Sequence, residues 1–321
     1  MKAHLLQPPD NPRLLTDHLI DGIEISMGDA LPSGGVDVLI GGRVTEADLA
    51  ASPNLRTIII PWAGPPEPLI NLVRAHPPLT LHNLHHNDIT TAEMAVALLM
   101  SAAKFIPMQD HRLHQGDWTP RYQPSGSALV YGKTALILGY GAIGRHAGRM
   151  LTGMGSHVIG VKRTPSTGDA APGVEIHPQG SLRLLLPRAN FLIITAPLTL
   201  ETRGLIGSTE MQLLPKGAIL VNVGRGLIVD QAALYDALIS GHLRAAGLDV
   251  WWNYPTDEAS RTHTLPSNFP HHELPNLVMT PHRGGEIDER EPHRYAALAE
   301  LLNAAARGEP IPNRVNLELG Y

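Results

Sequence analysis

The amino-acid sequence predicts an α/β protein with doubly wound parallel sheets, for three reasons. Short apolar runs alternate with helix-like segments along most of the chain, which is typical of parallel sheets covered by helices. The segment Gly139-Tyr-Gly-Ala-Ile-Gly144 lies between an expected strand, Thr134–Leu138, and an expected helix over 145–154, and a second strand over 157–162 follows. With 321 residues, 43% of them hydrophobic, the chain is long enough for two domains of ordinary size.

The composition argues against several classes of site and partner. The chain has no cysteine, so it can form neither a disulfide framework nor a thiolate zinc site, and we expect a cytoplasmic location. No apolar run approaches the ~20 residues of a membrane span, and the N-terminus lacks the pattern of a secretion signal. A net charge of −5 without a basic cluster argues against nucleic acid. We therefore expect a small-molecule substrate, with neither a membrane nor a nucleic acid as partner.

Two groups of histidines lie close together in the sequence: His82, His85 and His86, and then His111 with His114. No HExxH pattern accompanies either group. Surface or hydrogen-bonded histidines account for most such clusters, so we expect no metal site.

The first hundred residues are expected to alternate between short strands and helices. Within them, Trp62–Pro68 contains too many prolines to continue a strand. It is therefore expected to be a rigid loop at the carboxyl end of a strand, where open α/β sheets bind ligands. The expected strands cover residues 36–40, 55–60 and 79–84, and the expected helices cover 46–51 and 69–75.

A capping box at Thr90-Thr-Ala-Glu93 predicts the start of a long apolar helix that ends near Ile106 and is buried. The polar segment Met108–Tyr131 is expected to cross between the domains. The remaining expected elements are strands over 191–195, 218–222 and 245–250 and a last helix over roughly 291–306.

The glycine-rich segment is typical of a dinucleotide-binding loop. Gly139 allows a tight turn, Gly141 lets the backbone approach a pyrophosphate, and Gly144 lets helix and strand pack closely. Ala142 and Ile143 then lie at the helix N-terminus, which favours an anion. The alternative is a glycine-rich turn that binds no ligand.

The end of the second strand of this unit favours NADP(H), although NAD stays possible. An NAD-specific protein places an acidic residue there to hold the ribose hydroxyls. This chain has Lys162, Arg163 and Thr164 instead, and two cations and a hydroxyl suit a 2′-phosphate. The alternative is that both cations point to solvent.

Six motifs in order give the chain a resemblance to the D-isomer-specific 2-hydroxyacid dehydrogenase family over nearly its whole length. The resemblance implies a flavodoxin-like substrate domain of residues 1–105 and 287–321, into which a Rossmann-type nucleotide-binding domain of residues 106–286 is inserted. It also implies a homodimer formed through the nucleotide domain, and cofactor contacts from Ala196, Pro197, Thr202, Val223 and Asp249. The motifs are Asn87 with Ala92-Glu93, Gly139–Gly144, Thr195–Thr199 with Thr202 and Gly204–Gly207, Val221–Gly226, Gly247–Val250 and Thr280–His282.

The residues of these motifs suit hydride transfer between NADP(H) and a 2-keto or 2-hydroxy acid. Arg225 presents a fork of donors that fits a planar carboxylate. His282, at the carboxyl end of a strand, can give a proton to a carbonyl oxygen or take it back. The resemblance implies these two roles, and it places Asp249 near the nicotinamide carboxamide, although a buried capping aspartate would look the same.

The chain departs from the family at the third catalytic position. The family has a glutamate five residues after the aspartate of the Leu-Asp-Val motif, and this chain has Tyr254 there. A neutral phenol favours the imidazolium of His282 less than a carboxylate does. Either the histidine works with a lower pKa, or another carboxylate substitutes; the candidates are Asp257, Glu258, Glu273 and Glu286.

The loop after the second strand is a second departure, because Pro65 and Pro66 have no N–H to offer a substrate carboxylate. Ala63 and Gly64 can still donate. Trp62, together with Trp251 and Trp252, forms either an aromatic wall or plain core. His85, His86 and Asn87 are candidates for polar contacts to the substrate, and Asn87 is the one expected at the site.

Two other functions stay open. The position of Tyr254 is also non-acidic in the formate dehydrogenase branch of the family, which needs no proton transfer to a carbonyl. The same fold also serves as a non-enzymatic nucleotide sensor in transcriptional corepressors. Arg225 and His282 argue for an enzyme, and turnover distinguishes the alternatives.

Overall fold

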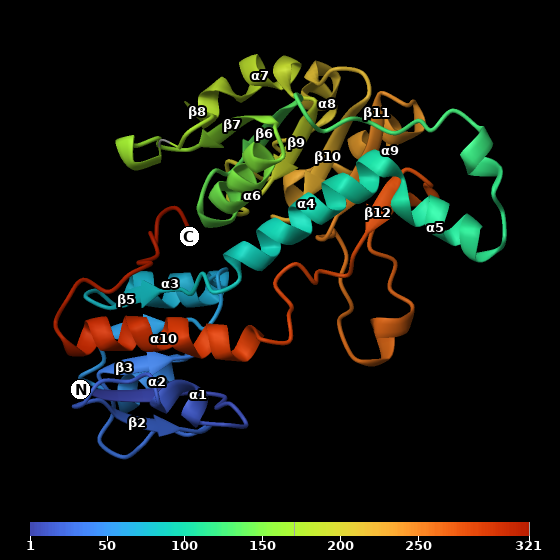
Figure 1. Cartoon of the computed structure of the whole chain (residues 1–321). Coiled ribbons are helices and arrows are strands. Elements are labelled where there is room, and N and C mark those ends of the chain that lie inside the picture. Colours follow the sequence, from blue (N-terminus) through green and yellow to red (C-terminus); the bar gives the residue numbers. More distant parts are fainter. Residues whose placement is uncertain (170, 321) are drawn as a thin grey trace. The chain divides into compact units, whose positions relative to one another are not determined.

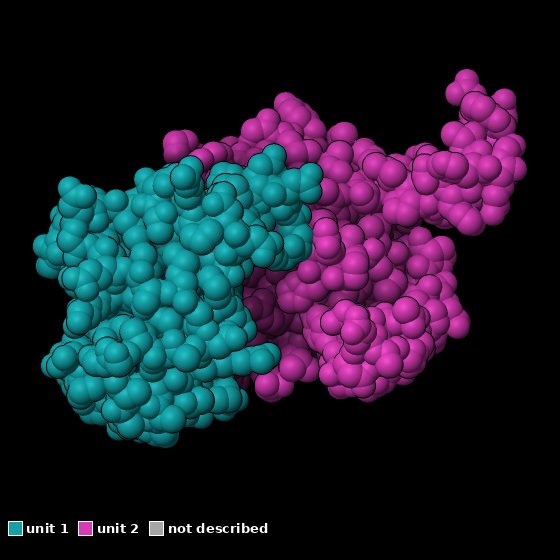
Figure 2. All heavy atoms as spheres, turned by 90° about the horizontal axis from the view of Figure 1, so that it is seen from below, with its two compact units in different colours: residues 1–87, 286–321 teal, residues 88–285 magenta. Residues whose placement is uncertain are grey.

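The computed structural model describes residues 1–169 and 171–320, which divide into two compact units. The first contains Met1–Asn87 and Glu286–Tyr321, and the second contains Asp88–Gly285 (Figure 2). Each unit is built on its own parallel sheet (Figure 1). The α/β class, with two doubly wound domains, is confirmed.

The first unit has a five-stranded sheet in the order β2-β1-β3-β4-β5, which is the flavodoxin-like order. The C-terminal helix α10 contributes Tyr295, Leu298 and Leu302 to the core on one face, together with Leu5 of β1. On the other face, α3 contributes Leu69, Ile70 and Val73 to the core. The elements are β1 (Lys2–Leu5), α1 (Arg13–Thr16), β2 (Glu24–Met27), β3 (Val38–Ile40), α2 (Glu46–Ala51), β4 (Thr57–Ile59), α3 (Glu67–Ala75), β5 (Thr80–His82) and α10 (Arg290–Ala306).

The second unit has a seven-stranded sheet in the order β12-β11-β10-β9-β6-β7-β8. Read from β8, this is the Rossmann order 3-2-1-4-5-6 extended by one strand. Helices α4 and α6 pack side by side against one face of the sheet. The elements are α4 (Asp88–Lys104), α5 (Ile106–His114), β6 (Thr134–Leu138), α6 (Ala142–Gly153), β7 (His157–Lys162), β8 (Val174–Pro178), α7 (Leu182–Leu185), β9 (Phe191–Ile194), α8 (Ser208–Leu213), β10 (Ala218–Asn222), α9 (Gln231–Ile239), β11 (Leu243–Leu248) and β12 (Leu277–Met279).

The expected strands and helices are present with small shifts at their ends, but the prediction of a capping box at Thr90 is wrong. Helix α4 begins at Asp88, so Thr90 lies inside its first turn. The side chain of Asp88 accepts the N–H of Ile89 at 2.8 Å. The helix is buried along one face through residues such as Leu98 and Leu99, whereas Ile89 is 49% exposed. The expectation that the helix over residues 90–106 is buried on all sides is therefore wrong as well.

The change of unit lies at Asn87/Asp88, earlier in the chain than expected. Helix α4 packs against β10 and β11, so residues 88–105 go with the nucleotide-type sheet. The segment expected to cross between domains instead forms α5 and a short helix over Thr119–Tyr122 within the second unit.

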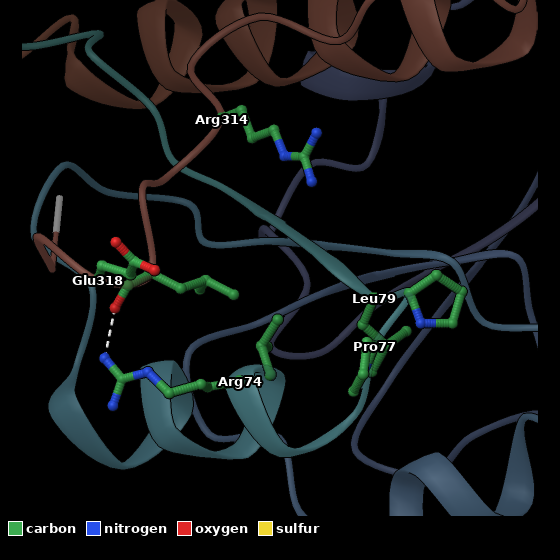
Figure 3. A pocket seen from close by; sticks show the side chains of 8 residues that line it. Arg74, Pro77, Leu79, Arg314 and Glu318 are labelled. Atoms are coloured by element: carbon green, nitrogen blue, oxygen red, sulfur yellow. Dashed lines mark hydrogen bonds between the residues drawn. The ribbon is translucent and has the colours of Figure 1, made fainter.

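A shallow hollow of about 380 Å³ lies on the first unit, between the turn that follows α3 and the C-terminal tail (Figure 3). Arg74, at the end of α3, donates a hydrogen bond to the carbonyl oxygen of Leu317 and thereby holds the tail. Arg314 and Glu318 also line the hollow, but none of the residues expected to bind substrate does.

Among the described residues, no single helix has the length and apolar character needed to cross a membrane. Helices α4 and α5 meet the test only when taken together, and they are bent by 64° at the break between them.

Candidate functional site

The loop between β6 and α6 has the shape of a phosphate cradle that only glycine can form. Gly139 has φ +98°, and a Cβ there would lie 2.4 Å from the backbone nitrogen of Ala196. A Cβ on Gly144 would lie 2.5 Å from the carbonyl oxygen of Gly139. By contrast, a Cβ on Gly141 would meet nothing within 4 Å. The open space beside Gly141 and the N-terminus of α6, at Ala142 and Ile143, fit a dinucleotide's phosphates.

The far side of the cradle is formed at the carboxyl ends of β9 and β10, which are neighbours in the sheet. Thr202 is 3% exposed, and its hydroxyl donates to the carbonyl of Pro197 at 2.7 Å. Ala196 and Val223 are also buried. A Cβ on Gly224 would lie 2.6 Å from the Ala196 carbonyl oxygen. The structure therefore brings Ala196, Pro197 and Val223 together with the glycine loop.

The cations at the end of β7 do not simply point to solvent. The Lys162 ammonium lies 2.7 Å from Oδ1 of Asp169, and Nη2 of Arg163 lies 3.0 Å from Glu201. Asp169 is buried and also faces Arg145 at 3.7 Å. Sequence reasoning missed Asp169 and Arg145. The signal available for Arg145 was its place directly after Gly144, at the start of α6.

The loop that carries His282 is held by the buried carboxylate of Asp249. Its Oδ1 accepts the Thr280 hydroxyl at 2.6 Å and the Arg283 N–H at 2.8 Å. Its Oδ2 accepts the Gly284 N–H at 2.8 Å. These three bonds hold both ends of a turn in which His282 has φ 57°, a left-handed conformation that a non-glycine residue adopts at a cost of about 1–2 kcal/mol. Asp249 therefore positions the histidine, whether or not it also contacts a cofactor.

Tyr254 is hydrogen-bonded to His282, with Oη 3.0 Å from Nδ1 of the imidazole. The same phenol oxygen accepts the N–H of Trp251 at 3.1 Å. The pKa of Tyr254 is raised, first by burial and further by the negative charge of Asp249, while Arg225 opposes the rise. Tyr254 is therefore a neutral phenol near pH 7, and its O–H can donate to Nδ1. That arrangement puts the proton of a neutral imidazole on Nε2.

Arg225 follows β10 and has an exposed guanidinium. Its Nη1 donates to the carbonyl of Gly224 at 2.7 Å. Asn222 is 1% exposed; its amide donates to the Arg225 carbonyl at 2.9 Å and accepts the Gly224 N–H at 3.0 Å. Asn222 thus fixes the backbone that presents Arg225, a role that sequence reasoning did not assign.

The carboxylates considered as substitutes for the family glutamate have other partners. Asp257 accepts the N–H of Ser260 at 2.8 Å. Glu258 pairs with Arg261, Glu273 with His272, and Glu286 with Arg290. The phenol of Tyr254 is a hydrogen-bond partner of Nδ1 of His282.

Of the two tryptophans after β11, Trp251 belongs to the core and Trp252 packs against it. Trp251 is 6% exposed and donates from Nε1 to the Thr280 carbonyl at 2.9 Å. Trp252 is partly buried and donates from Nε1 to the Val229 carbonyl at 2.8 Å. Their hydrogen bonds stabilise the segment that carries Tyr254.

The expected substrate loop belongs to the first unit. Trp62 is 37% exposed and donates from Nε1 to the carbonyl of Gly64 at 3.1 Å. The amide of Asn83 donates to the Ala63 carbonyl at 2.6 Å, which ties the loop to the end of β5. Asn87 is the last residue of the N-terminal segment of this unit.

No group of three or more histidine, cysteine, aspartate or glutamate side chains is arranged to hold a metal ion in the part of the chain that the structure describes. The buried ring of His82 is bonded to the Pro312 carbonyl at 2.8 Å and to the Thr80 hydroxyl at 3.2 Å. On α5, His111 and His114 are bonded to Gln115 and to the carbonyl of Asp110.

Comparison with known proteins gives related sequences over most of the chain. The family model described as "D-isomer specific 2-hydroxyacid dehydrogenase, NAD binding domain" matches residues 96–284. The chain is 34% identical over 285 residues to the D-3-phosphoglycerate dehydrogenase of Mycobacterium tuberculosis, covering 88% of this chain and 51% of that protein. It is 36% identical over 235 residues to the glyoxylate reductase of Korarchaeum cryptofilum, covering 72% and 67%. The chain therefore spans about half the length of the phosphoglycerate dehydrogenase it matches.

Among solved structures, the chain is similar to a D-isomer specific 2-hydroxyacid dehydrogenase from Xanthobacter autotrophicus Py2, crystallised in complex with NADPH and MES. The TM-score is 0.78 at 26% sequence identity, and the match covers 99% of each chain.

Proposed function

The chain belongs to the family of D-isomer specific 2-hydroxyacid dehydrogenases, and we propose that it transfers a hydride between NADP(H) and a small 2-keto or 2-hydroxy acid. The observation that carries the proposal is the exposed imidazole of His282 on a loop held by Asp249 and hydrogen-bonded to Tyr254 at 3.0 Å. The exposed guanidinium of Arg225 acts electrostatically on the same tyrosine.

The bound cofactor supplies the hydride or accepts it, and the residues of the chain handle the proton. In reduction, the imidazolium of His282 gives a proton to the keto oxygen, and in oxidation the neutral imidazole takes it from the hydroxyl. Because Nδ1 faces the phenol of Tyr254, the proton moves at Nε2. The bonds from Asp249 hold the ring in place while the proton moves.

Arg225 is proposed to bind the substrate carboxylate. A guanidinium has five N–H donors, and the bond to the Gly224 carbonyl uses one of them. The remaining donors suit a planar carboxylate and its adjacent keto oxygen. The backbone N–H groups of Ala63 and Gly64, with Trp62 and Asn87, are proposed as further contacts from the first unit.

The preference for NADP(H) over NAD(H) is supported by Lys162, Arg163 and Thr164 at the end of β7. The similar Xanthobacter protein was crystallised with NADPH. Fluorescence titration with NADPH and NADH tests the preference directly; equal affinity for the two contradicts it.

A homodimer is proposed from the apolar side chains along residues 106–131. Figure 1 shows α5 and the segment after it extending away from the sheet of the second unit. Leu113 is 49% exposed, Trp118 60% and Tyr131 70%, which is unusual for a surface that stays in water. Sedimentation analysis is expected to show a dimer that Leu113→Glu weakens. The matched substitution Leu184→Glu, at an exposed leucine of α7, should leave the dimer intact. A cytoplasmic location remains a prediction from composition.

Turnover tests the proposed activity. We expect the protein to oxidise NADPH with one or more acids in a panel from glyoxylate and hydroxypyruvate to phenylpyruvate. His282→Ala is expected to lower kcat/KM by about 10²–10⁴-fold while NADPH binding is retained.

The replacement of the family glutamate by Tyr254 is the observation that favours a second function, a non-enzymatic NAD(P)H sensor. Tight NADPH binding without turnover of any acid, together with a change of oligomeric state, would support the sensor.

A further inference from the structure

Asp169 is a buried carboxylate with both oxygens engaged. Its side chain is 2% exposed, and Oδ1 lies 2.7 Å from the Lys162 ammonium. The other oxygen, Oδ2, accepts the N–H of Ser166 at 2.8 Å and its hydroxyl at 2.9 Å. The pKa of Asp169 is lowered, chiefly by the hydrogen bond from Lys162, so the group is ionised at neutral pH.

These bonds close residues 162–169 into a ring, which we call the Asp169 ring. It starts at Lys162, the last residue of β7, and returns through the short helix Thr167–Asp169. The N–H of Asp169 also donates to the carbonyl of Ser166 at 3.1 Å. All three residues expected at a 2′-phosphate, Lys162, Arg163 and Thr164, lie on this ring.

The charge at the ring stays positive although it contains a carboxylate. Three cations, Lys162, Arg163 and Arg145, face two carboxylates, Asp169 and Glu201. An ammonium has three N–H donors, and Asp169 takes one of those on Lys162. The side chain of Lys162 is 31% exposed, so its remaining donors have access to a ligand.

We infer that Asp169 is a positioning residue for the 2′-phosphate of NADP(H): it fixes the Lys162 ammonium, draws in Arg145 and closes the ring that carries Arg163 and Thr164. The inference rests on the proposed use of NADP(H). A lysine held in one place before binding loses less conformational freedom when it meets a phosphate. Asp169 therefore strengthens NADPH binding, although its own charge has the sign that repels a phosphate.

Because the carboxylate of Asp169 is buried, we expect it to position Lys162 rather than to repel the phosphate of the cofactor. A carboxylate exposed at the end of β7 would face the ligand and repel it. Asp169 lies seven residues further on, faces inward, and is compensated by Lys162 and by two donors from Ser166. Its negative charge is neutralised by hydrogen bonds inside the ring, whereas the side chains of Lys162 and Arg145 are partly exposed.

The test is equilibrium fluorescence titration with NADPH and with NADH on the wild-type protein, on Asp169→Asn, and on Asp236→Asn as a matched control on α9. We expect Asp169→Asn to raise the Kd for NADPH about tenfold and to change that for NADH less than about twofold. Asp236→Asn should change neither. Retained NADH binding shows that the glycine cradle is still folded in the variant.

A double-mutant cycle with Lys162→Met tests whether Asp169 acts through the lysine. If it does, Asp169→Asn raises the Kd for NADPH by a clearly smaller factor in the Lys162→Met background than in the wild type. Full additivity overturns the inference, as does NADPH binding to Asp169→Asn that is as tight as, or tighter than, that of the wild type. An equal loss for NADH and NADPH also overturns it, since the ring would then be merely structural. A wild-type protein without preference for NADPH contradicts the proposed cofactor instead, so the two failures are distinguishable.

Discussion

The phenol oxygen of Tyr254 accepts the Trp251 N–H and lies 3.0 Å from Nδ1 of His282, so its own proton is available to the imidazole. A donor at Nδ1 favours the neutral ring, whereas a carboxylate at this position accepts a hydrogen bond from the protonated Nδ1 and favours the charged ring. A phenol is neutral near pH 7, and burial raises the pKa of Tyr254 further from that range.

The first prediction follows from this pair. Reduction requires the imidazolium, so its rate falls as pH rises, and in the wild-type protein the fall is expected at lower pH than in a relative with the glutamate. Tyr254→Glu places a carboxylate beside the ring and should move the fall upward by about one pH unit or more. The measurement is kcat/KM for the keto acid against pH at saturating NADPH. Tyr254→Gln is the uncharged control of similar size; equal profiles for the two variants would rule out electrostatic coupling to His282.

The second prediction separates two roles for Asp249. If this residue mainly positions the loop, Asp249→Asn leaves a buried N–H without an acceptor and should reduce stability by about 1–3 kcal/mol. It should also lower kcat at least about tenfold, because His282 is no longer held, while the Kd for NADPH stays within about twofold. Thermal unfolding and NADPH titration measure the two effects. Thr280→Val removes one of the same bonds and should give a smaller loss. A large rise in the NADPH Kd with normal kcat would instead indicate direct contact with the cofactor.

The third prediction contrasts two glycines of the cradle. A Cβ at Gly141 meets nothing within 4 Å, so Gly141→Ala should leave the Tm unchanged and weaken NADPH binding about tenfold, because the methyl group occupies the phosphate's space. A Cβ at Gly144 would lie 2.5 Å from the Gly139 carbonyl oxygen, so Gly144→Ala should lower stability by about 1–3 kcal/mol. Thermal shift and fluorescence titration on both variants measure this. Loss of stability in Gly141→Ala would show that its site is packed rather than open.

The positions of the two residues proposed to act on the substrate could be predicted from sequence because parallel strands end at one edge of a sheet. Arg225 and His282 each follow an apolar run, and the structure places them after β10 and β12. Asp169 could not be predicted in this way. The contact between Asp169 and Lys162 depends on a reversal of the chain between them, and no periodicity in the sequence marks that reversal.

Two features of the fold, the strand β1 and the start of helix α4, were also difficult to predict from the sequence. Strand β1 contains His4, a polar residue that argues against a buried strand when the sequence alone is considered. In the structure its ring is bonded to the Ser26 hydroxyl and the Gly28 carbonyl, both at 2.8 Å. At α4, the pattern from Thr90 to Glu93 suggested a cap, but the helix starts earlier, at Asp88, which pairs with His146 of α6 at 3.5 Å. The hydrogen-bond partners that accommodate His4 lie 22 and 24 residues away in the sequence, where no local pattern marks them.

The fourth prediction concerns acid stability and His271. This histidine is 0% exposed, with Nδ1 2.8 Å from the Ser267 hydroxyl and its ring stacked on Trp252 and edge-on to Tyr235. Burial, with a smaller contribution from the charge of His272, lowers its pKa. The unfolded chain therefore takes up a proton below about pH 6.5 that the folded protein does not bind.

Stability is consequently expected to be full above about pH 6.5 and to decline as the pH falls below that value toward the lower pKa of the folded state. His271→Gln removes the titrating group and should flatten the Tm profile between about pH 7.5 and pH 5.5, whatever its effect on the absolute Tm. His272→Gln is the matched control, because this neighbour in the same short helix is partly exposed. It should keep most of the wild-type slope, since the charge of His272 lowers the pKa of His271 less than burial does. Thermal unfolding at constant ionic strength measures the slopes. If His271→Gln retains the wild-type slope, the acid sensitivity arises elsewhere, and the buried His82 of the first unit, whose pKa burial also lowers, becomes the residue to test.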